Sequence, residues 1–331
     1  MQFKTSFATV LCALLIAPAA GEEVDPQCQS DLTCVRSSPA VLKRERAQVP
    51  DLALWQPVAN AAAAIGTGQG PAAEGPAARL AEPLLGTDLV LIPAACYRPP
   101  EQHGATAPAP APVCIKPFYM GVHEVSFDAF DRFTEATSRE PADDEGWGRG
   151  SRPVINVNLY DALGFAKWLS KRTGAHYRLP TETEWEHAAR AGSRGLYPWG
   201  DALGTGRANC AGCGSPWDGE STAPVGSFPP NAWGLYDMVG NVGEWTCSMR
   251  DPDPAHSFEQ CDSIYETRRR VFRNGGWSDR PARLQLAARD WNAAMRRTDD
   301  VGFRLVRECP ACAAPSIPDQ SPDQIHVAAE R

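Results

Sequence analysis

The segment Gly234–Trp245 restricts the fold of this chain more than any other stretch. Three oxygen-bearing side chains, Asp237, Asn241 and Glu244, fall within it. Gly240 allows the sharp turn that points backbone carbonyls inward. Hard cations such as Ca²⁺ take about six to eight oxygens from such mixtures of carboxylate and carbonyl. The spacing differs from that of an EF-hand, so the segment indicates an irregular loop with an oxygen cage and is only a weak calcium signal.

The composition favours a loop-rich globular protein. The chain has 331 residues, of which 43% are hydrophobic, and it contains 10 Trp and 28 Gly. This length suits one large domain with extensions, or two domains. A net charge of −8 argues against a general nucleic-acid binder. The basic clusters at 268–270 and 296–297 are interpreted as solvated surface.

The N-terminus predicts export. Residues 1–19 read as a signal peptide, with Lys4 before a short apolar run and small residues at Ala17 and Ala19. The apolar run is too short to cross a bilayer, and no other segment is a candidate span. We therefore expect a periplasmic or secreted protein without a membrane span.

Ten cysteines remain after the predicted signal peptide, an even number that suggests disulfides in an exported chain. Neighbouring cysteines predict the pairs Cys96–Cys114 and Cys247–Cys261, each worth about 3 kcal/mol on the chain-entropy model. Two further couples have CxxC spacing, Cys210 with Cys213 and Cys309 with Cys312. Structural disulfides are the favoured interpretation of these couples. A shared four-cysteine zinc site and a redox role are the alternatives.

The domain organisation follows from shifts in composition. Residues 20–86 predict a small N-terminal element and a flexible linker rich in Ala, Gly and Pro. A folded domain is expected over 87–310, and a disordered tail over 311–331.

Several regular elements are predicted within the domain. Strands are expected over 88–92 and 118–125. Helices are expected from Phe127 and over 160–172. A third helix should begin at the capping box of Thr181 and Glu184, continue to Arg190 and be closed by Gly192. The rest, from residue 197 onward, should consist mostly of loops and short strands.

Five further motifs flank the Gly234–Trp245 segment. They are Tyr177–Gly192 (YRLPTETEWEHAARAG), Tyr197–Gly200 (YPWG), Thr222–Asn231 (TAPVGSFPPN), Arg270–Trp277 (RVFRNGGW) and Val301–Arg304 (VGFR). In this order, over about residues 89–307, they resemble the formylglycine-generating enzyme, or sulfatase-modifying factor, family. The resemblance implies an α+β protein with a variant C-type-lectin-like fold, low in regular secondary structure and stabilised by calcium.

The resemblance also implies two structural calcium sites. The first would use Asn209, Cys210, Asp218 and Glu220. The second would use Asp237, Gly240, Val242 and Glu244. The alternative is structural, with Asp237 and Asn241 capping turns and Glu244 paired with an arginine.

The copper-dependent enzymes of the family carry two cysteines shortly after a Gly-Gly-Ser-aromatic motif. Here the motif reads Asn274-Gly-Gly-Trp277, and no cysteine lies between Cys261 and Cys309. Asp279 stands about where the first cysteine would be, and a carboxylate is too hard a ligand to replace a thiolate for copper(I). We therefore expect neither copper nor sulfatase-activating activity. The histidines show no metal-ligand spacing, and whether the chain is an enzyme at all stays open.

Two functions remain, and no catalytic residue is assigned. The first is an exported binding or scaffold module for a peptide, protein or glycan, with a ligand groove after the Gly-Gly motif. Its residues would be Trp277, Asp279, Arg280, Arg289, Asp290, Trp291 and Asn292. The alternative is a cysteine-independent oxidoreductase or tailoring enzyme for an exported peptide or siderophore precursor, with Asp279 or Asp290 as acid or base. Arg289 and Arg304 are also candidates for core ion pairs with Glu244 or Asp237.

Overall fold

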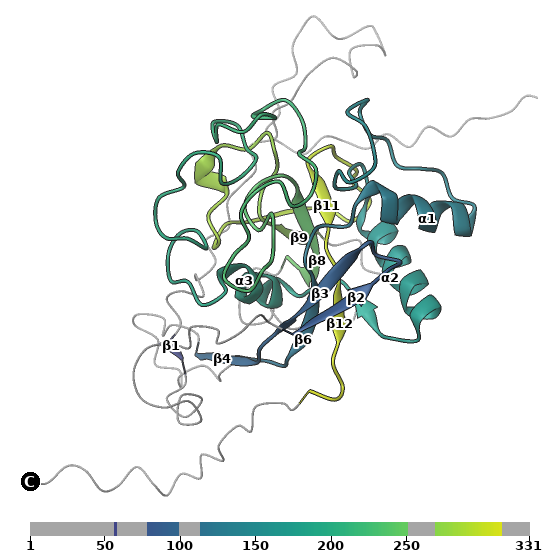
Figure 1. The fold of residues 1–331 in the computed structure, drawn as a ribbon, viewed down its shortest axis with the longest axis horizontal. Helices are drawn as coiled ribbons and strands as arrows, with labels where there is room; N and C mark the ends of the chain where they lie inside the picture. The colour runs from purple at the N-terminus through teal and green to yellow at the C-terminus, as the bar shows by residue number, and fades with distance from the viewer. Residues whose placement is uncertain (1–55, 58–77, 99–112, 251–268, 313–331) are drawn as a thin grey trace, which may run out of the picture. The chain divides into compact units, whose positions relative to one another are not determined.

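The computed structural model describes residues 56–57, 78–98, 113–250 and 269–312. The predicted signal peptide, Cys261, and most of the predicted linker and tail lie outside these ranges. The described residues form a mixed α+β structure, as predicted, in which helices pack on several small sheets (Figure 1).

A five-stranded antiparallel sheet holds the two ends of the domain together. Its strands, in spatial order, are β2 (Arg79–Glu82), β3 (Thr87–Ile92), β6 (Phe118–Gly121), β12 (Val306–Glu308) and β7 (Tyr177–Arg178). The apolar alternation of β3 and β6 places Val90, Ile92 and Met120 in the core at 0% exposure. The prediction placed β2 in the flexible linker. That boundary is wrong, because β2 pairs with β3 from Arg79 onward.

A four-stranded sheet positions the candidate site. Its order is β10 (Arg289–Ala293), β9 (Arg269–Arg273), β8 (Gly243–Met249) and β11 (Val301–Phe303). β11 pairs with β8 in parallel, with Val301 opposite Gly243, while the other pairs are antiparallel. The segment predicted as an oxygen-rich loop therefore runs directly into a buried strand.

A smaller sheet contains β1 (Gln56–Pro57), β4 (Ala95–Arg98) and β5 (Val113–Ile115). Cys96 faces Cys114 across β4 and β5, and the two form the predicted disulfide. This link joins the ends of the segment that lies between the two strands.

The three predicted helices are present. They are α1 (Phe127–Thr137), α2 (Leu159–Thr173) and α3 (Glu182–Arg190). Side chains of Ser126, Asn158 and Thr181 cap their N-termini, the last two in capping boxes. α3 ends at Arg190, as predicted, and its C-cap is Ala191, in the left-handed region at φ 45°, one residue before the Gly192 predicted to close the helix.

Two apolar clusters fill the interior. The aromatic rings of Phe130, Phe133, Phe165 and Phe303 pack together where α1 and α2 lie side by side (Figure 1). The second cluster lies around Trp185 of α3 and strands β3 and β6. No helix among the described residues is long and apolar enough to cross a membrane.

One surface prediction is wrong. Arg270, expected on a solvated basic face, is 2% exposed and donates from Nη1 to the carbonyl of Cys247 at 3.0 Å. Its neighbour Arg269 is exposed, as are Arg296 and Arg297. The alternation of β9 accounts for the difference, because successive side chains point to opposite faces.

Candidate functional site

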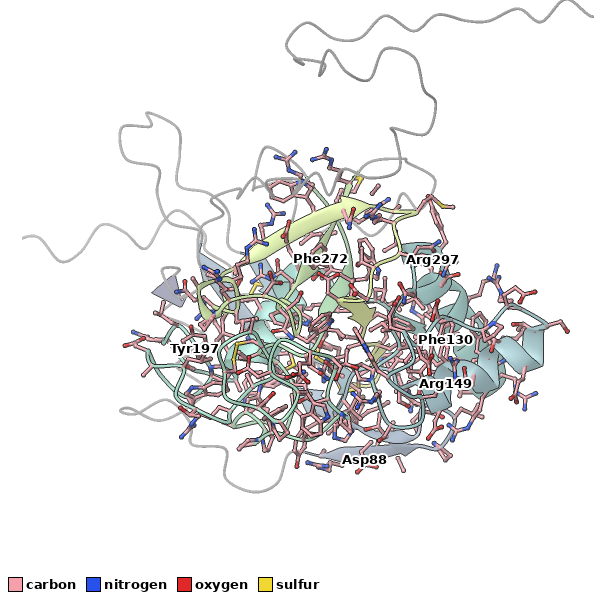
Figure 2. All side chains as sticks on the ribbon, turned by 90° about the horizontal axis from the view of Figure 1, so that it is seen from above. Asp88, Phe130, Arg149, Tyr197, Phe272 and Arg297 are labelled. Atoms are coloured by element: carbon pink, nitrogen blue, oxygen red, sulfur yellow. A yellow bond between two sulfur atoms is a disulfide. The ribbon has the colours of Figure 1, made fainter. Side chains whose placement is uncertain are left out.

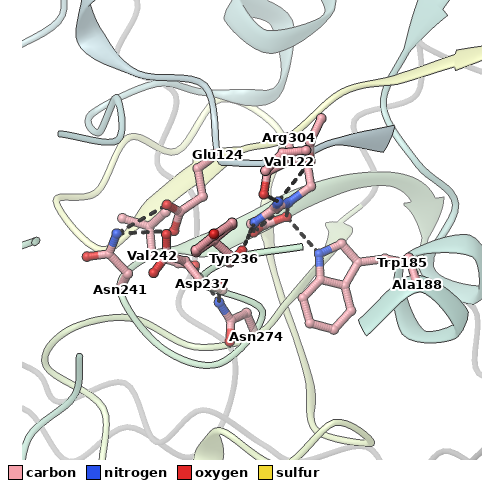
Figure 3. A network of polar contacts seen from close by, with 12 residues as sticks. Val122, Glu124, Trp185, Ala188, Tyr236, Asp237, Asn241, Val242, Asn274 and Arg304 are labelled. Carbon is pink, nitrogen blue, oxygen red and sulfur yellow. Dashed lines mark hydrogen bonds and ion pairs between the residues drawn. The ribbon is translucent and has the colours of Figure 1, made fainter. Parts of the chain in front are cut away.

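A buried ion pair between Arg304 and Glu244 forms the centre of the site. Figure 3 shows Arg304 within the surrounding network of polar contacts. Both side chains are 0% exposed, and Nη2 of the arginine lies 2.8 Å from Oε1 of the glutamate. The pairing of β11 with β8 brings the two together. The Nε–H also donates to Glu244, at 3.0 Å from Oε2, and the three remaining guanidinium hydrogens go to the carbonyls of Gly121, Val122 and Tyr236, each at 2.9 Å. Arg304 thus uses its full set of donors.

Glu244 is also bonded to α3. The indole Nε1 of Trp185 donates to Glu244 Oε2 at 2.7 Å, and both residues are buried. The structural alternative for Glu244, pairing with an arginine, is therefore confirmed. A buried carboxylate neutralised in this way avoids the large free-energy cost of an isolated buried charge.

Two further carboxyl groups lie in the same buried network (Figure 3). Burial, followed by the charges of Asp237 and Glu244, raises the pKa of Glu124 well above its usual range. Burial raises the pKa of Asp237 to about 6. Glu124 accepts from the side-chain amide of Asn241 at 3.2 and 3.3 Å. The raised pKa of Glu124 favours its neutral, protonated form, which limits the buried negative charge.

In the predicted second calcium loop, three backbone carbonyls accept hydrogen bonds from one side-chain amide. Nδ2 of Asn274 donates to the carbonyls of Asp237, Gly240 and Val242 at 3.0, 2.6 and 3.1 Å. The carbonyls of Gly240 and Val242, predicted as calcium ligands, thus both accept from this amide, and calcium in this loop stays untested. The Asp237 carboxylate turns away and accepts from the Gly226 N–H at 2.6 Å through Oδ2. Its Oδ1 has no hydrogen-bond partner among the described residues.

The residues predicted for the first calcium site share one loop, which contains the disulfide Cys210–Cys213. Oδ1 of Asn209 accepts from the Ser215 hydroxyl at 2.6 Å. Asp218 accepts from the backbone N–H groups of Gly212 and Gly214 at 2.6 and 2.5 Å. Glu220 is exposed. The donor chemistry, amide and carboxylate oxygens beside backbone carbonyls, fits calcium, and calcium there stays a prediction.

A second buried charge network joins α3 to β9 and β10. Arg289 donates to both oxygens of Glu182 at 2.9 and 2.8 Å, and both side chains are 1% exposed. Arg273 reaches Glu186 at 2.5 Å. The groove assignment of Arg289 is wrong, because the alternation of β10 turns this side chain into the core. It is a core ion-pair residue, although its partner is Glu182 and not Glu244 or Asp237.

The remaining groove residues divide into two groups. The ring of Trp277 meets Trp147 edge-to-face at 5.0 Å, and its Nε1 donates to the Asp299 carbonyl at 3.0 Å. Both tryptophans are partly exposed. Trp147 was not predicted as a site residue. In the sequence, Gly146 and Gly148 on either side of Trp147 indicated a turn at this position.

The second group surrounds Arg283, whose Nη1 lies 3.4 Å from Asp279 and 3.6 Å from Asp290. Arg280 is exposed at the start of the short 3₁₀ helix η4 (Pro281–Arg283). Asn292 is partly exposed on β10. Trp291 does not join the group, because it is 8% exposed and covered by the guanidinium of Arg250 at 3.9 Å from the ring centroid.

Three residues that the sequence interpretation missed are central to the site. Glu124 interrupts the apolar run that contains β6, and a charge inside such a run signals a buried ionisable group. Asn274 stands directly before the Gly-Gly pair, and its left-handed φ of 83° favours Asn, Asp or Gly. Trp185 lies on the inner face of the predicted helix.

A separate cavity of about 570 Å³ lies between α1, α2 and the segment before β11. Its lining includes Phe130 and Arg297, which lie toward the same side of the molecule in Figure 2. Arg297 pairs with Asp161 at 2.6 Å. None of the predicted groove residues lines this cavity.

Both CxxC couples form disulfides, Cys210 with Cys213 and Cys309 with Cys312. The four-cysteine zinc alternative is therefore wrong, since a disulfide offers no thiolate. Cys247 is disulfide-bonded as well. The disulfide with Cys309 also links Cys312, within the predicted tail of residues 311–331, to the folded domain.

Comparison with known proteins identifies relatives over the described domain. An inactive C-alpha-formylglycine-generating enzyme 2 from Bos taurus is 35% identical over 190 residues, 50% of this chain and 54% of that protein. The formylglycine-generating enzyme of Mycobacterium tuberculosis is 41% identical over 184 residues, 48% of this chain and 58% of that enzyme. The chain thus spans about half the length of these curated relatives.

The solved structure of PvdO from Pseudomonas aeruginosa matches with a TM-score of 0.57 and 27% identity, over 72% of this chain and 100% of PvdO. CarF matches with a TM-score of 0.53 and 25% identity, over 68% of this chain and 99% of CarF. The sulfatase-modifying factor enzyme 1-like domain matches residues 81–309. This match covers well over half of the chain, which therefore belongs to the family of sulfatase-modifying factor enzyme 1-like domains.

Proposed function

We propose that this protein is an exported recognition module, with the C-type-lectin-like architecture implied by its family, that does not carry out copper-dependent oxidation. The observation that carries the proposal is the segment Ser278–Arg289, which contains no cysteine. Copper(I) requires soft ligands, and this segment offers hydroxyl, carboxylate, amide and guanidinium groups. The Bos taurus relative, whose name describes it as inactive, shows that the family includes members without the activity.

The environment of Asp279 supports the loss of copper chemistry. This carboxylate accepts from the Gly276 N–H at 3.1 Å and lies beside Arg283. A positive charge next to the position of the missing first cysteine opposes binding of a cation there. The same groups, with the Trp147–Trp277 pair, supply the aromatic and arginine contacts that dominate recognition surfaces.

The first experiment tests the loss of oxidation. A Cys-x-Pro-x-Arg peptide is incubated with copper, reductant and this protein, and mass spectrometry follows the cysteine. The peptide should stay unmodified, while the Mycobacterium tuberculosis enzyme converts it under the same conditions. Catalytic conversion by this protein would overturn the proposal.

The second experiment tests recognition. Displayed peptides and immobilised glycans are screened with the purified protein, and hits are compared with two variants. Trp277→Ala should weaken binding about tenfold or more, the loss expected when an aromatic anchor is truncated. Trp199→Ala, which removes another partly exposed tryptophan that stacks on Tyr197, should not. Equal binding by both variants would exclude the Trp147–Trp277 surface.

A tailoring enzyme is the second candidate, favoured by the two carboxylates held on either side of Arg283. Asp279 and Asp290 are partly exposed, with side-chain exposures of 13% and 19%. A carboxylate in this setting is a candidate acid or base for proton transfer. Turnover of a peptide precursor that Asp290→Asn abolishes, with binding retained, would favour this enzyme over the module.

We also propose one structural calcium ion, in the first loop. Asn209 and Asp218 supply the side-chain oxygens, and Cys210 and Glu220 would add carbonyls. A ligand that binds only the folded state raises its stability by mass action. Chelation should therefore lower the melting temperature of the wild type, and Asp218→Asn should abolish this sensitivity. Identical melting curves with calcium and with chelator would contradict the proposal.

A further inference from the structure

The loop predicted as the second calcium site forms a cage of backbone carbonyls that contains a side-chain amide where a calcium ion would lie. Three backbone carbonyls, those of Asp237, Gly240 and Val242, point at Nδ2 of Asn274. The distances of 2.6 to 3.1 Å suit N–H···O hydrogen bonds, whereas calcium–oxygen distances are about 2.3–2.6 Å. The side chain is 5% exposed, so water does not compete for these acceptors.

The orientation of the amide is fixed by its other end. The N–H of Gly240 donates to Oδ1 of Asn274 at 2.6 Å. Turning the amide over would set its NH₂ against that N–H and its oxygen against three carbonyls. The observed orientation is therefore the one that satisfies both sides of the cage.

The backbone of the cage is held from outside. Gly240 lies so close to Asn209 that an added Cβ would stand 2.3 Å from the Asn209 carbonyl oxygen. The Asn241 N–H donates to the same oxygen at 2.8 Å. These contacts direct the carbonyls inward, and converging carbonyls need a positively polarised partner.

Of the two carboxylates predicted as ligands, Glu244 is engaged at both oxygens and Asp237 at one. Glu244 is neutralised by Arg304 and bonded to Trp185. Oδ2 of Asp237 accepts from the N–H of Gly226, and its Oδ1 has no hydrogen-bond partner among the described residues. A cation in the cage would have to displace the amide of Asn274 and would find no unpaired Glu244 carboxylate.

From these contacts we infer that Asn274 is a built-in substitute for the second calcium ion. Its NH₂ group supplies the positive end of a dipole where the family resemblance implies a cation. The second loop of this protein is consequently independent of calcium. The inference is separate from the calcium proposed for the first loop, and one can hold without the other.

The test replaces Asn274 by Asp, which is isosteric and suits the left-handed backbone. An oxygen then faces three carbonyls, so the melting temperature in chelator should fall by about 5 °C or more. Millimolar calcium should restore it, because the cage would then contain only oxygens. Asn292→Asp is the matched control for the added charge, and it should show neither effect.

A second variant covers the case in which Asn274→Asp fails to fold. Asn274→Gly keeps the backbone conformation and empties the cage, and it should gain a calcium response absent from the parent. Both variants are made in an Asp218→Asn background, in which the first loop should no longer bind calcium. Differential scanning calorimetry and calcium titration then report on the second loop alone.

Two results would overturn the inference. One is calcium binding by the Asp218→Asn parent that Asp237→Asn or Glu244→Gln removes, since the second loop would then hold a cation beside Asn274. The other is a melting temperature for Asn274→Asp or Asn274→Gly that does not depend on calcium. If the melting temperature of the wild type does not respond to calcium, only the proposal of a calcium ion in the first loop is contradicted.

Discussion

Single residues account for much of the order in the buried site, and Arg304 is the clearest example. Its guanidinium donates to Glu244 and to three carbonyls from other segments. Arg304→Lys would keep the charge but replace a planar set of five donors by three on one atom. Breaking a buried pair costs about 3–5 kcal/mol, and urea unfolding should show a loss of this size. Arg297→Lys, at an exposed pair, should cost less than about 1 kcal/mol. A small loss for Arg304→Lys would mean that the network tolerates unpaired acceptors.

His187 makes the stability depend on pH. Burial lowers the pKa of this imidazole from 6.5 to about 4. The unfolded chain therefore binds a proton below pH 6.5 that the folded protein does not take up until about pH 4. The contribution of His187 to the free energy of unfolding should decrease as the pH falls through this window, by about 2 kcal/mol between pH 7.5 and 5. His187→Gln, compared with the wild type by urea unfolding at both pH values, should reduce the fall. An unchanged fall would assign it to other groups, such as His123, whose pKa burial also lowers to about 4.

At the scale of elements, α3 is fixed to the four-stranded sheet by charge as well as by apolar packing. Glu182 and Glu186 on α3 face Arg289 on β10 and Arg273 on β9. Arg289→Ala would remove the closer ion pair of the buried Glu182, whose carboxylate lies 3.8 Å from Arg273. We expect a loss of about 3 kcal/mol in the free energy of unfolding without a specific loss of ligand binding. Arg283→Ala, at a partly exposed pair, is the control and should cost less than about 1 kcal/mol. A stable Arg289→Ala variant with impaired binding would restore Arg289 to the recognition surface.

At the scale of the whole molecule, helices with local sequence signals could be predicted, whereas contacts between residues distant in the sequence could not. The capping residue Thr181 and the periodicity of Phe127, Phe130 and Phe133 identify their helices without tertiary information. The partner of Arg289 depends on how α3 lies against β10, which no local pattern encodes. The same holds for Asn274, since its role appears only when the chain returns to a loop more than thirty residues earlier. The glycines of the loop made the carbonyl cage predictable, but not the side-chain amide of Asn274 inside it.

The disulfides stabilise the molecule unequally, because they close segments of different length. Cys96–Cys114 spans 18 residues, whereas Cys309–Cys312 spans 3. On the chain-entropy model, the longer link is worth about 3 kcal/mol, and the shorter one constrains an unfolded chain much less. Replacing both Cys96 and Cys114 by Ser should therefore lower the melting temperature by several degrees, roughly 6–10 °C for a domain of this size. The matched double Ser replacement at Cys309 and Cys312 should have a clearly smaller effect. Thiol titration of the denatured, unreduced wild type should find almost no free thiol. Equal shifts for the two double variants would mean that native-state packing around the disulfides, and not the length of the closed segment, sets their contribution.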